Sequence, residues 1–160
     1  EDPFARTVVS VLNQQLSTAS AAAIRDRVFD RFEVTPSGML DAEEAALRDA
    51  GLSRQKVEYV REIARAFADG RIDPDRYAGM DDGAVVADLT AVRGVGDWTA
   101  KMFLMFVLGR EDVFPVEDLG IRRGMEALFD DPTRAEMVDL AEPWRPYRSY
   151  ASLYLWRAVD

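Results

Sequence analysis

Apolar residues in this chain return every three to four positions, and alternation with a period of two is almost absent. A period near 3.6 places apolar side chains on one side of an α-helix, whereas half-buried strands alternate with a period of two. The first stripe consists of Phe4, Val8, Val11, Leu12 and Leu16. No apolar run reaches about 18 residues, the length that a membrane-spanning helix requires. The pattern therefore predicts an all-α fold with no membrane partner.

Capping residues and chain breakers divide the sequence into about ten helices on short connectors. Ser17 or Thr18 is expected to cap a helix over 19–32, with Ala23 facing inward, and the run 35–38 is expected to break it. Further helices are expected over 42–50, 53–70, 98–108, 119–129, 133–141 and 146–159, with short helices beginning at 73 and 81. A chain of 160 residues suits one domain, or two small lobes that share a core.

Cysteine and histidine are both absent from the sequence. Without cysteine the chain can form no disulfide, no iron–sulfur cluster and no thiolate zinc site. Without histidine it lacks the commonest general base and the commonest metal ligand. Acid–base chemistry would therefore fall to Asp, Glu, Lys or Tyr side chains.

The net charge is −9, yet the charges are spread unevenly along the chain. Residues 1–92 carry 11 basic and 17 acidic residues, whereas residues 93–123 carry five of each. Nucleic-acid-binding proteins usually present a positive patch, so the overall balance argues against a phosphate backbone as partner. The central segment is the part of the chain that repels a polyanion least.

The most informative segment is Leu89–Ala100, which contains Gly94-Val-Gly96. A helix is expected to end near Val92, and a second helix is expected to begin just after Gly96. Glycines at 94 and 96 permit positive φ and carry no Cβ, so a phosphate can approach the backbone. The first N–H groups of the second helix then offer an anion site that needs no basic side chain. An ordinary αα-hairpin with glycine C-caps is the alternative at this point.

A carboxylate follows the hairpin in the segment Asp112–Gly120, which leads into the next expected helix. Asp118 is in position to cap the N-terminus of that helix, as aspartate often does. The positive end of the helix dipole favours an ionised carboxylate there. Glu117 is interpreted as a solvated side chain.

Together these segments resemble the helix-hairpin-helix DNA glycosylase superfamily, and most closely its DNA-3-methyladenine glycosylase II branch. The matching segments are 13–17, 51–56, the hairpin with Trp98-Thr99-Ala100, 114–118 and 144–156, which together span nearly the whole chain. The resemblance implies an all-α, two-lobed fold with the active cleft between the lobes. It implies one glycosylase domain over 1–160, with the hairpin motif at about 89–109 and the catalytic loop at 112–120. The chain opens almost inside its first helix, so an N-terminal segment before Glu1 is expected to be missing.

The resemblance also implies roles for individual side chains. Asp118 matches the catalytic aspartate of the family. Trp98, Met102 and Trp156 match positions that line the base pocket, with core packing as the alternative for each. Gln15 matches the wedge that fills the gap left by a flipped nucleotide, with a cap or surface position as its alternative.

The hairpin is implied to bind DNA and a cation. The expected DNA-binding residues are Gly94, Val95, Gly96 and Thr99. The backbone carbonyls of Thr90, Val92 and Val95 match oxygens that coordinate a monovalent cation, Na⁺ or K⁺, which bridges to phosphate. No cofactor is required for the reaction of the family.

The activity implied is hydrolysis of the N-glycosidic bond of alkylated purines of the 3-methyladenine type in double-stranded DNA, after base flipping. Bifunctional members of the superfamily carry a nucleophilic lysine where this chain has Trp98, so the enzyme is expected to be monofunctional. A monomer is expected, acting on the nucleoid in the cytoplasm of a prokaryote. The alternatives are a glycosylase for other damaged or mismatched bases and a non-enzymatic hairpin module that binds DNA.

Overall fold

The computed structural model describes residues 2–14 and 16–159, and over these ranges it is helical without any strand. The all-α prediction is therefore confirmed. Gln15, the predicted wedge, lies outside the described residues. Across the described ranges, none of the helices has both the length and the apolar character of a membrane span.

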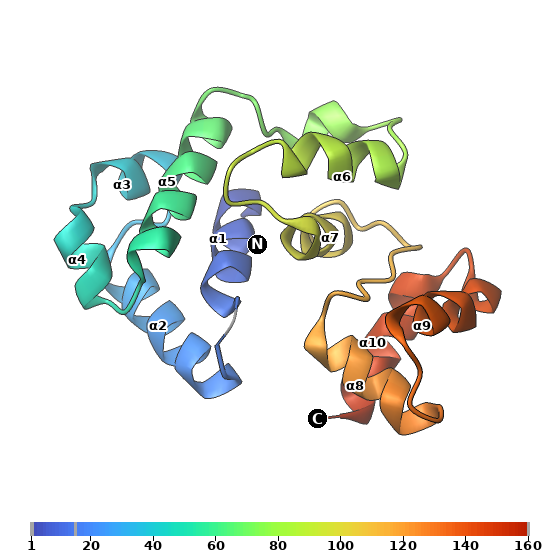
Figure 1. Cartoon of the computed structure of the whole chain (residues 1–160). Helices are drawn as coiled ribbons and strands as arrows, with labels where there is room; N and C mark the ends of the chain where they lie inside the picture. The colour runs from blue at the N-terminus through green and yellow to red at the C-terminus, as the bar shows by residue number, and fades with distance from the viewer. Residues whose placement is uncertain (1, 15, 160) are drawn as a thin grey trace. The chain divides into compact units, whose positions relative to one another are not determined.

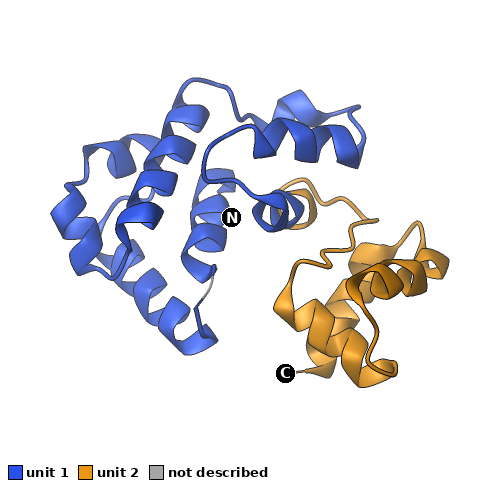
Figure 2. Ribbon diagram, in the orientation of Figure 1, with its two compact units in different colours: residues 1–103 blue, residues 104–160 orange. Residues whose placement is uncertain are grey.

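The chain divides into two compact units, residues 1–103 and 104–160 (Figure 2). The elements of the first unit are α1 (Pro3–Asn13), α2 (Thr18–Arg31), α3 (Pro36–Asp41), α4 (Glu44–Asp49), α5 (Arg54–Ala68), the 3₁₀ turn η1 (Pro74–Tyr77) and α6 (Asp82–Thr90) (Figure 1). Helix α7 (Asp97–Phe106) begins in the first unit and ends in the second. The second unit continues with α8 (Leu119–Leu128), α9 (Arg134–Ala141), the 3₁₀ turn η2 (Glu142–Trp144) and α10 (Arg148–Ala158).

Local capping signals explain where most helices begin. The side chains of Ser17, Ser53 and Asp118 accept a backbone N–H three residues ahead and so begin α2, α5 and α8. Thr133 begins α9 with a reciprocal capping box to Glu136.

Three details of the helix prediction differ from the structure. Helix α2 ends before the run 35–38, as expected, but the run also begins α3, which was not predicted, because Thr35 accepts the N–H of Gly38 and Pro36 fits the first helical position. The stripe of α1 ends with the helix at Asn13, so Leu16 lies beyond it and is exposed. On α2 the buried small residue is Ala21, whereas Ala23 is exposed.

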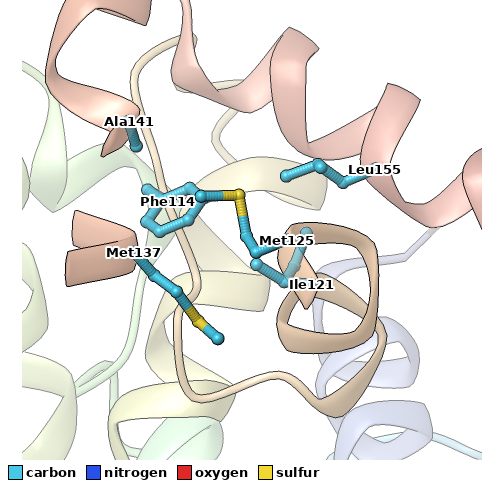
Figure 3. Packing of buried hydrophobic residues seen from close by; sticks show 6 residues of the cluster. All are labelled: Phe114, Ile121, Met125, Met137, Ala141 and Leu155. Atoms are coloured by element: carbon cyan, nitrogen blue, oxygen red, sulfur yellow. The ribbon is translucent and has the colours of Figure 1, made fainter. Parts of the chain in front are cut away.

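Each unit has its own apolar core. In the first unit α5 packs against α1, α3 and α4, and Phe4 of α1 meets Phe67 of α5 edge to face at 5.3 Å between ring centroids. In the second unit α8 packs against α9 and α10. Its core consists of Phe114, Ile121, Met125, Met137, Ala141 and Leu155 (Figure 3). Phe114 packs in this core and so fixes the position of the loop that leads to Asp118.

Candidate functional site

Asp118 stands at the N-terminus of α8, where two donors reach the same carboxylate oxygen. A turn in which the Asp118 N–H donates to the carbonyl of Pro115 brings the residue to this position. The backbone N–H of Ile121 donates to Oδ2 at 2.9 Å, and Nε1 of Trp156 donates to Oδ2 at 2.6 Å. The carboxylate is therefore held at the positive end of the helix dipole and oriented by α10.

The indole of Trp156 is closely surrounded within the second unit. A Cβ on Gly120 would lie 2.7 Å from Cδ1 of Trp156 and 3.0 Å from Oδ2 of Asp118. On another side the ring of Phe106 stacks on the indole, with centroids 6.0 Å apart and planes inclined by 29°. The absence of a side chain at 120 therefore lets the indole N–H reach the carboxylate.

Sequence reasoning missed Phe106, the last residue of α7. Its side chain is 42% exposed although its ring stacks on Trp156. Phe106 follows Met102 by four residues, and positions four apart lie on the same side of a helix. The spacing of four, which already relates the predicted pocket residues Trp98 and Met102, could therefore have identified Phe106 one turn further along α7.

Residues in the first half of α10 form hydrogen bonds to the loop that precedes Asp118. The Ser149 hydroxyl accepts the N–H of Val113 at 2.9 Å and donates to the carbonyl of Arg110 at 2.7 Å. The Arg148 guanidinium donates to both carboxylate oxygens of Asp112, at 2.8 and 3.1 Å. These contacts give a structural reason for the tail motif in segment 144–156, one of the segments that carry the resemblance.

The hydrogen bonds from Arg148 lower the pKa of the Asp112 carboxyl below its ordinary value, although partial burial opposes them. A carboxyl with a lowered pKa in the folded state stabilises the fold above its ordinary pKa, and this contribution is lost as the pH falls. We expect Asp112→Asn to reduce the free energy of unfolding at pH 7 by about 1–3 kcal/mol, the value of a hydrogen bond to a charged group. The difference from the wild type should be smaller at about pH 3, below the ordinary pKa of an aspartate, than at pH 7.

Urea unfolding of the wild type and of Asp112→Asn at pH 7 and at about pH 3 checks this prediction. A difference that stays constant across the range would contradict the assigned role of the Asp112 charge.

The hairpin has the geometry that the sequence predicts. Helix α6 ends at Thr90, the N–H of Val95 donates to the carbonyl of Val92 at 3.0 Å, and α7 begins at Asp97. Gly94 has a φ of +99°, which favours glycine. Gly96, which could also adopt positive φ, is not among the residues that do.

The two hairpin glycines have different surroundings. A Cβ on Gly94 would lie 2.8 Å from Cβ and 3.0 Å from Cα of Tyr59 on α5, whereas a Cβ on Gly96 would have no atom within 4 Å. Gly94 is therefore required for the packing of the turn on α5. Gly96 is open on the side where its Cβ would stand.

The other predicted residues of the hairpin and of α7 differ in exposure. The Thr99 side chain is 1% exposed, and its hydroxyl accepts a hydrogen bond from Nε2 of Gln14 at 2.7 Å. Val95 and Met102 are also buried, and Trp98 is half-buried. A ligand would therefore meet Val95 and Thr99 through their backbone rather than their side chains.

Within each unit the structure brings some of the predicted site residues together. Asp118 and Trp156 are in direct contact in the second unit. Trp98 and Met102 lie on α7 directly after the hairpin turn in the first unit. Arg93, the residue before Gly94, forms an ion pair with Glu58 at 2.7 Å.

The family model of the HhH-GPD superfamily of base excision DNA repair proteins matches residues 8–146. DNA-3-methyladenine glycosylase 1 of Schizosaccharomyces pombe is 31% identical over 169 residues, which cover 98% of this chain and 72% of the relative. YfjP of Bacillus subtilis is 32% identical over 164 residues, 94% of this chain, and this chain spans 56% of its length.

A solved structure gives a consistent result. The structure of the Schizosaccharomyces pombe 3-methyladenine DNA glycosylase Mag1 in complex with abasic DNA superposes with a TM-score of 0.89 at 30% identity. The superposition covers 98% of this chain and 80% of that one. The chain therefore belongs to the HhH-GPD superfamily of base excision DNA repair proteins, in its DNA-3-methyladenine glycosylase branch.

Proposed function

We propose that this chain is a monofunctional DNA glycosylase that removes alkylated purines of the 3-methyladenine type from double-stranded DNA. The observation that carries the proposal is the Asp118 carboxylate, held at the N-terminus of α8 by the N–H groups of Ile121 and Trp156. An oriented negative charge of this kind stabilises positive charge on a reacting sugar. The relatives named above support the choice of alkylated purines.

The proposed reaction begins with a nucleotide flipped out of the duplex, at a cost of a few kcal/mol in unstacking. A purine alkylated at N3 or N7 is cationic, so it leaves without protonation by a general acid. The bond between C1′ and the base nitrogen breaks, and its electron pair goes to the departing base. Water then forms a bond to C1′ and gives up a proton to the surrounding solvent. Asp118 stabilises the positive sugar and orients this water.

The remaining site residues have supporting roles in the proposal. Trp98, Met102 and Trp156 line the base pocket, where electron-rich indoles attract a cationic base by roughly 0.5–2 kcal/mol. Gln15 is the wedge. Residues 1–160 act as one glycosylase domain with the hairpin motif at about 89–109 and the catalytic loop at 112–120.

The hairpin is proposed to hold the DNA backbone with Gly94, Val95, Gly96 and the N–H of Thr99. The carbonyls of Thr90, Val92 and Val95 would hold a monovalent cation. The carbonyl of Val92 accepts the N–H of Val95, and a carbonyl oxygen has a second lone pair, so this acceptor fits the ligand set. The bound cation would supply charge to a phosphate, and the reaction uses no other cofactor. We propose a monomer that acts on the nucleoid in the cytoplasm of a prokaryote.

Gly96→Val should weaken binding to every DNA sequence alike, by roughly tenfold if one hydrogen bond to a phosphate is lost. The new side chain would stand where a phosphate approaches the turn, in space that is otherwise open. Because no protein atom is displaced, the melting temperature should stay within a few degrees of the wild type. Fluorescence anisotropy with a labelled duplex measures the affinity. Unchanged affinity would contradict a phosphate contact at Gly96.

The release of free bases from methylated duplex DNA, followed by chromatography, tests the proposed activity. We expect 3-methyladenine to be released. Release of an oxidised or mismatched base instead would favour another glycosylase of the superfamily. DNA binding with no release of any base would favour a non-enzymatic module, a function that leaves the contact between Trp156 and Asp118 without a purpose.

A further inference from the structure

A groove of about 400 Å³ lies beside the hairpin in the first unit. It is lined by the end of α1, by the first turns of α5 and by the turn 94–96, and it is named the hairpin groove here. Its lining includes Gln14, Gln55, Tyr59 and one charged residue, Lys56. Among the described residues that line it, none is a carboxylate.

A second groove of the same unit provides a comparison. It also runs along α5, but three glutamates and three arginines line it: Glu44, Glu58, Glu62, Arg54, Arg61 and Arg65. Its formal charges therefore balance, whereas those of the hairpin groove sum to one positive charge. In a chain with a net charge of −9, a polyanion meets least repulsion where the local charge is positive.

The Lys56 ammonium is fixed at the C-terminus of α1. Its Nζ donates to the carbonyl of Leu12 at 3.1 Å and to the carbonyl of Gln14 at 2.7 Å. An ammonium group has three donors, and among the described residues only Leu12 and Gln14 accept one. Burial lowers the pKa of Lys56, so an anion in the groove would favour the charged form of the amine.

The walls of the groove are held together by contacts between distant residues. Gln14 donates from Nε2 to the hydroxyl of Thr99 in the first turn of α7. Gly94 packs directly on Tyr59. The ammonium group is thus preorganised next to the turn where Gly96 is open to a ligand.

We propose that the hairpin groove binds a second DNA phosphate, adjacent to the phosphate at the hairpin turn, and that Lys56 supplies the charge that holds it. The inference rests on the proposed function, since it assumes that the hairpin binds DNA. It gives a specific role to one of the two lysines in a chain whose other basic residues are arginines.

The salt dependence of DNA binding tests this role. Each phosphate neutralised by a protein cation contributes about −0.9 to the slope of log K against log salt concentration, where K is the association constant. We expect Lys56→Gln to make this negative slope shallower by about 0.9, measured with a labelled duplex that contains a tetrahydrofuran abasic analogue. Arg65→Gln is the matched control, since it removes one exposed positive charge from the same helix. It should keep the wild-type slope.

Lys56→Arg separates charge from helix capping. The guanidinium keeps the charge but changes the contacts to the end of α1, so the slope should remain that of the wild type even if the melting temperature falls. A wild-type slope in Lys56→Gln would overturn the proposal, and so would an equal loss of slope in Lys56→Arg. Absence of salt-dependent binding by the wild type would instead contradict the proposed function itself.

Discussion

Asp118→Asn should reduce the rate of base excision by at least about a thousandfold, because it removes a charge that stabilises the transition state by several kcal/mol. The fold should survive, since asparagine caps a helix N-terminus as well as aspartate does. Affinity for a duplex with an abasic analogue should stay within about tenfold of the wild type, since no phosphate contact is lost. Single-turnover excision and anisotropy measure the two quantities.

Asp130→Asn is the matched control for this substitution. Asp130 is an exposed carboxylate in the same unit, and its loss should leave the excision rate unchanged. Turnover of Asp118→Asn near the wild-type rate would contradict the assignment of Asp118.

Gly120→Ala should slow excision by roughly 10- to 100-fold, the value of one hydrogen bond to a charged group. The added Cβ would stand 2.7 Å from Cδ1 of Trp156, so the indole must move and its N–H must leave Asp118. Alanine favours the helix more than glycine does, so a loss of helix propensity cannot explain the effect. The rate of excision should fall while the affinity for abasic DNA stays within about threefold.

Two further variants show whether Gly120→Ala acts through Trp156. Trp156→Phe removes the N–H donor and keeps an aromatic ring. If both changes break the same hydrogen bond, the double variant should be no slower than the slower single variant. If the double variant instead loses excision rate by the product of the two single losses, the two changes do not act through the same hydrogen bond. Gly83→Ala, whose Cβ would meet its nearest atom at an ordinary 3.5 Å, should behave like the wild type.

The helices and the hairpin could be predicted because their signals are local. Caps such as Ser53 and Asp118 act three residues ahead, and both begin helices as expected. Helix α3 was not predicted because a threonine followed by a proline is typical both of a break and of a helix start. Without knowledge of the following packing, the sequence does not distinguish the two.

Contacts between distant residues could not be predicted from pattern. Gly94 and Gly96 are equivalent in the sequence, yet only Gly94 packs on Tyr59, 35 positions earlier. The resemblance identified Asp118 and Trp156 separately, but periodicity does not predict a hydrogen bond between residues 38 positions apart. Phe106 is predictable from its spacing on α7, because it follows Met102 by four positions and so lies on the same side of the helix.

The product formed on the DNA tests the central claim most directly. An end-labelled duplex with one alkylated purine is incubated with the enzyme, and half of the sample is then heated in alkali. We predict strand cleavage only in the alkali-treated half, and no covalent complex after addition of borohydride, because Asp118 assists water and Trp98 supplies no amine. An uncleaved strand in both halves, or cleavage without alkali, would contradict a monofunctional glycosylase.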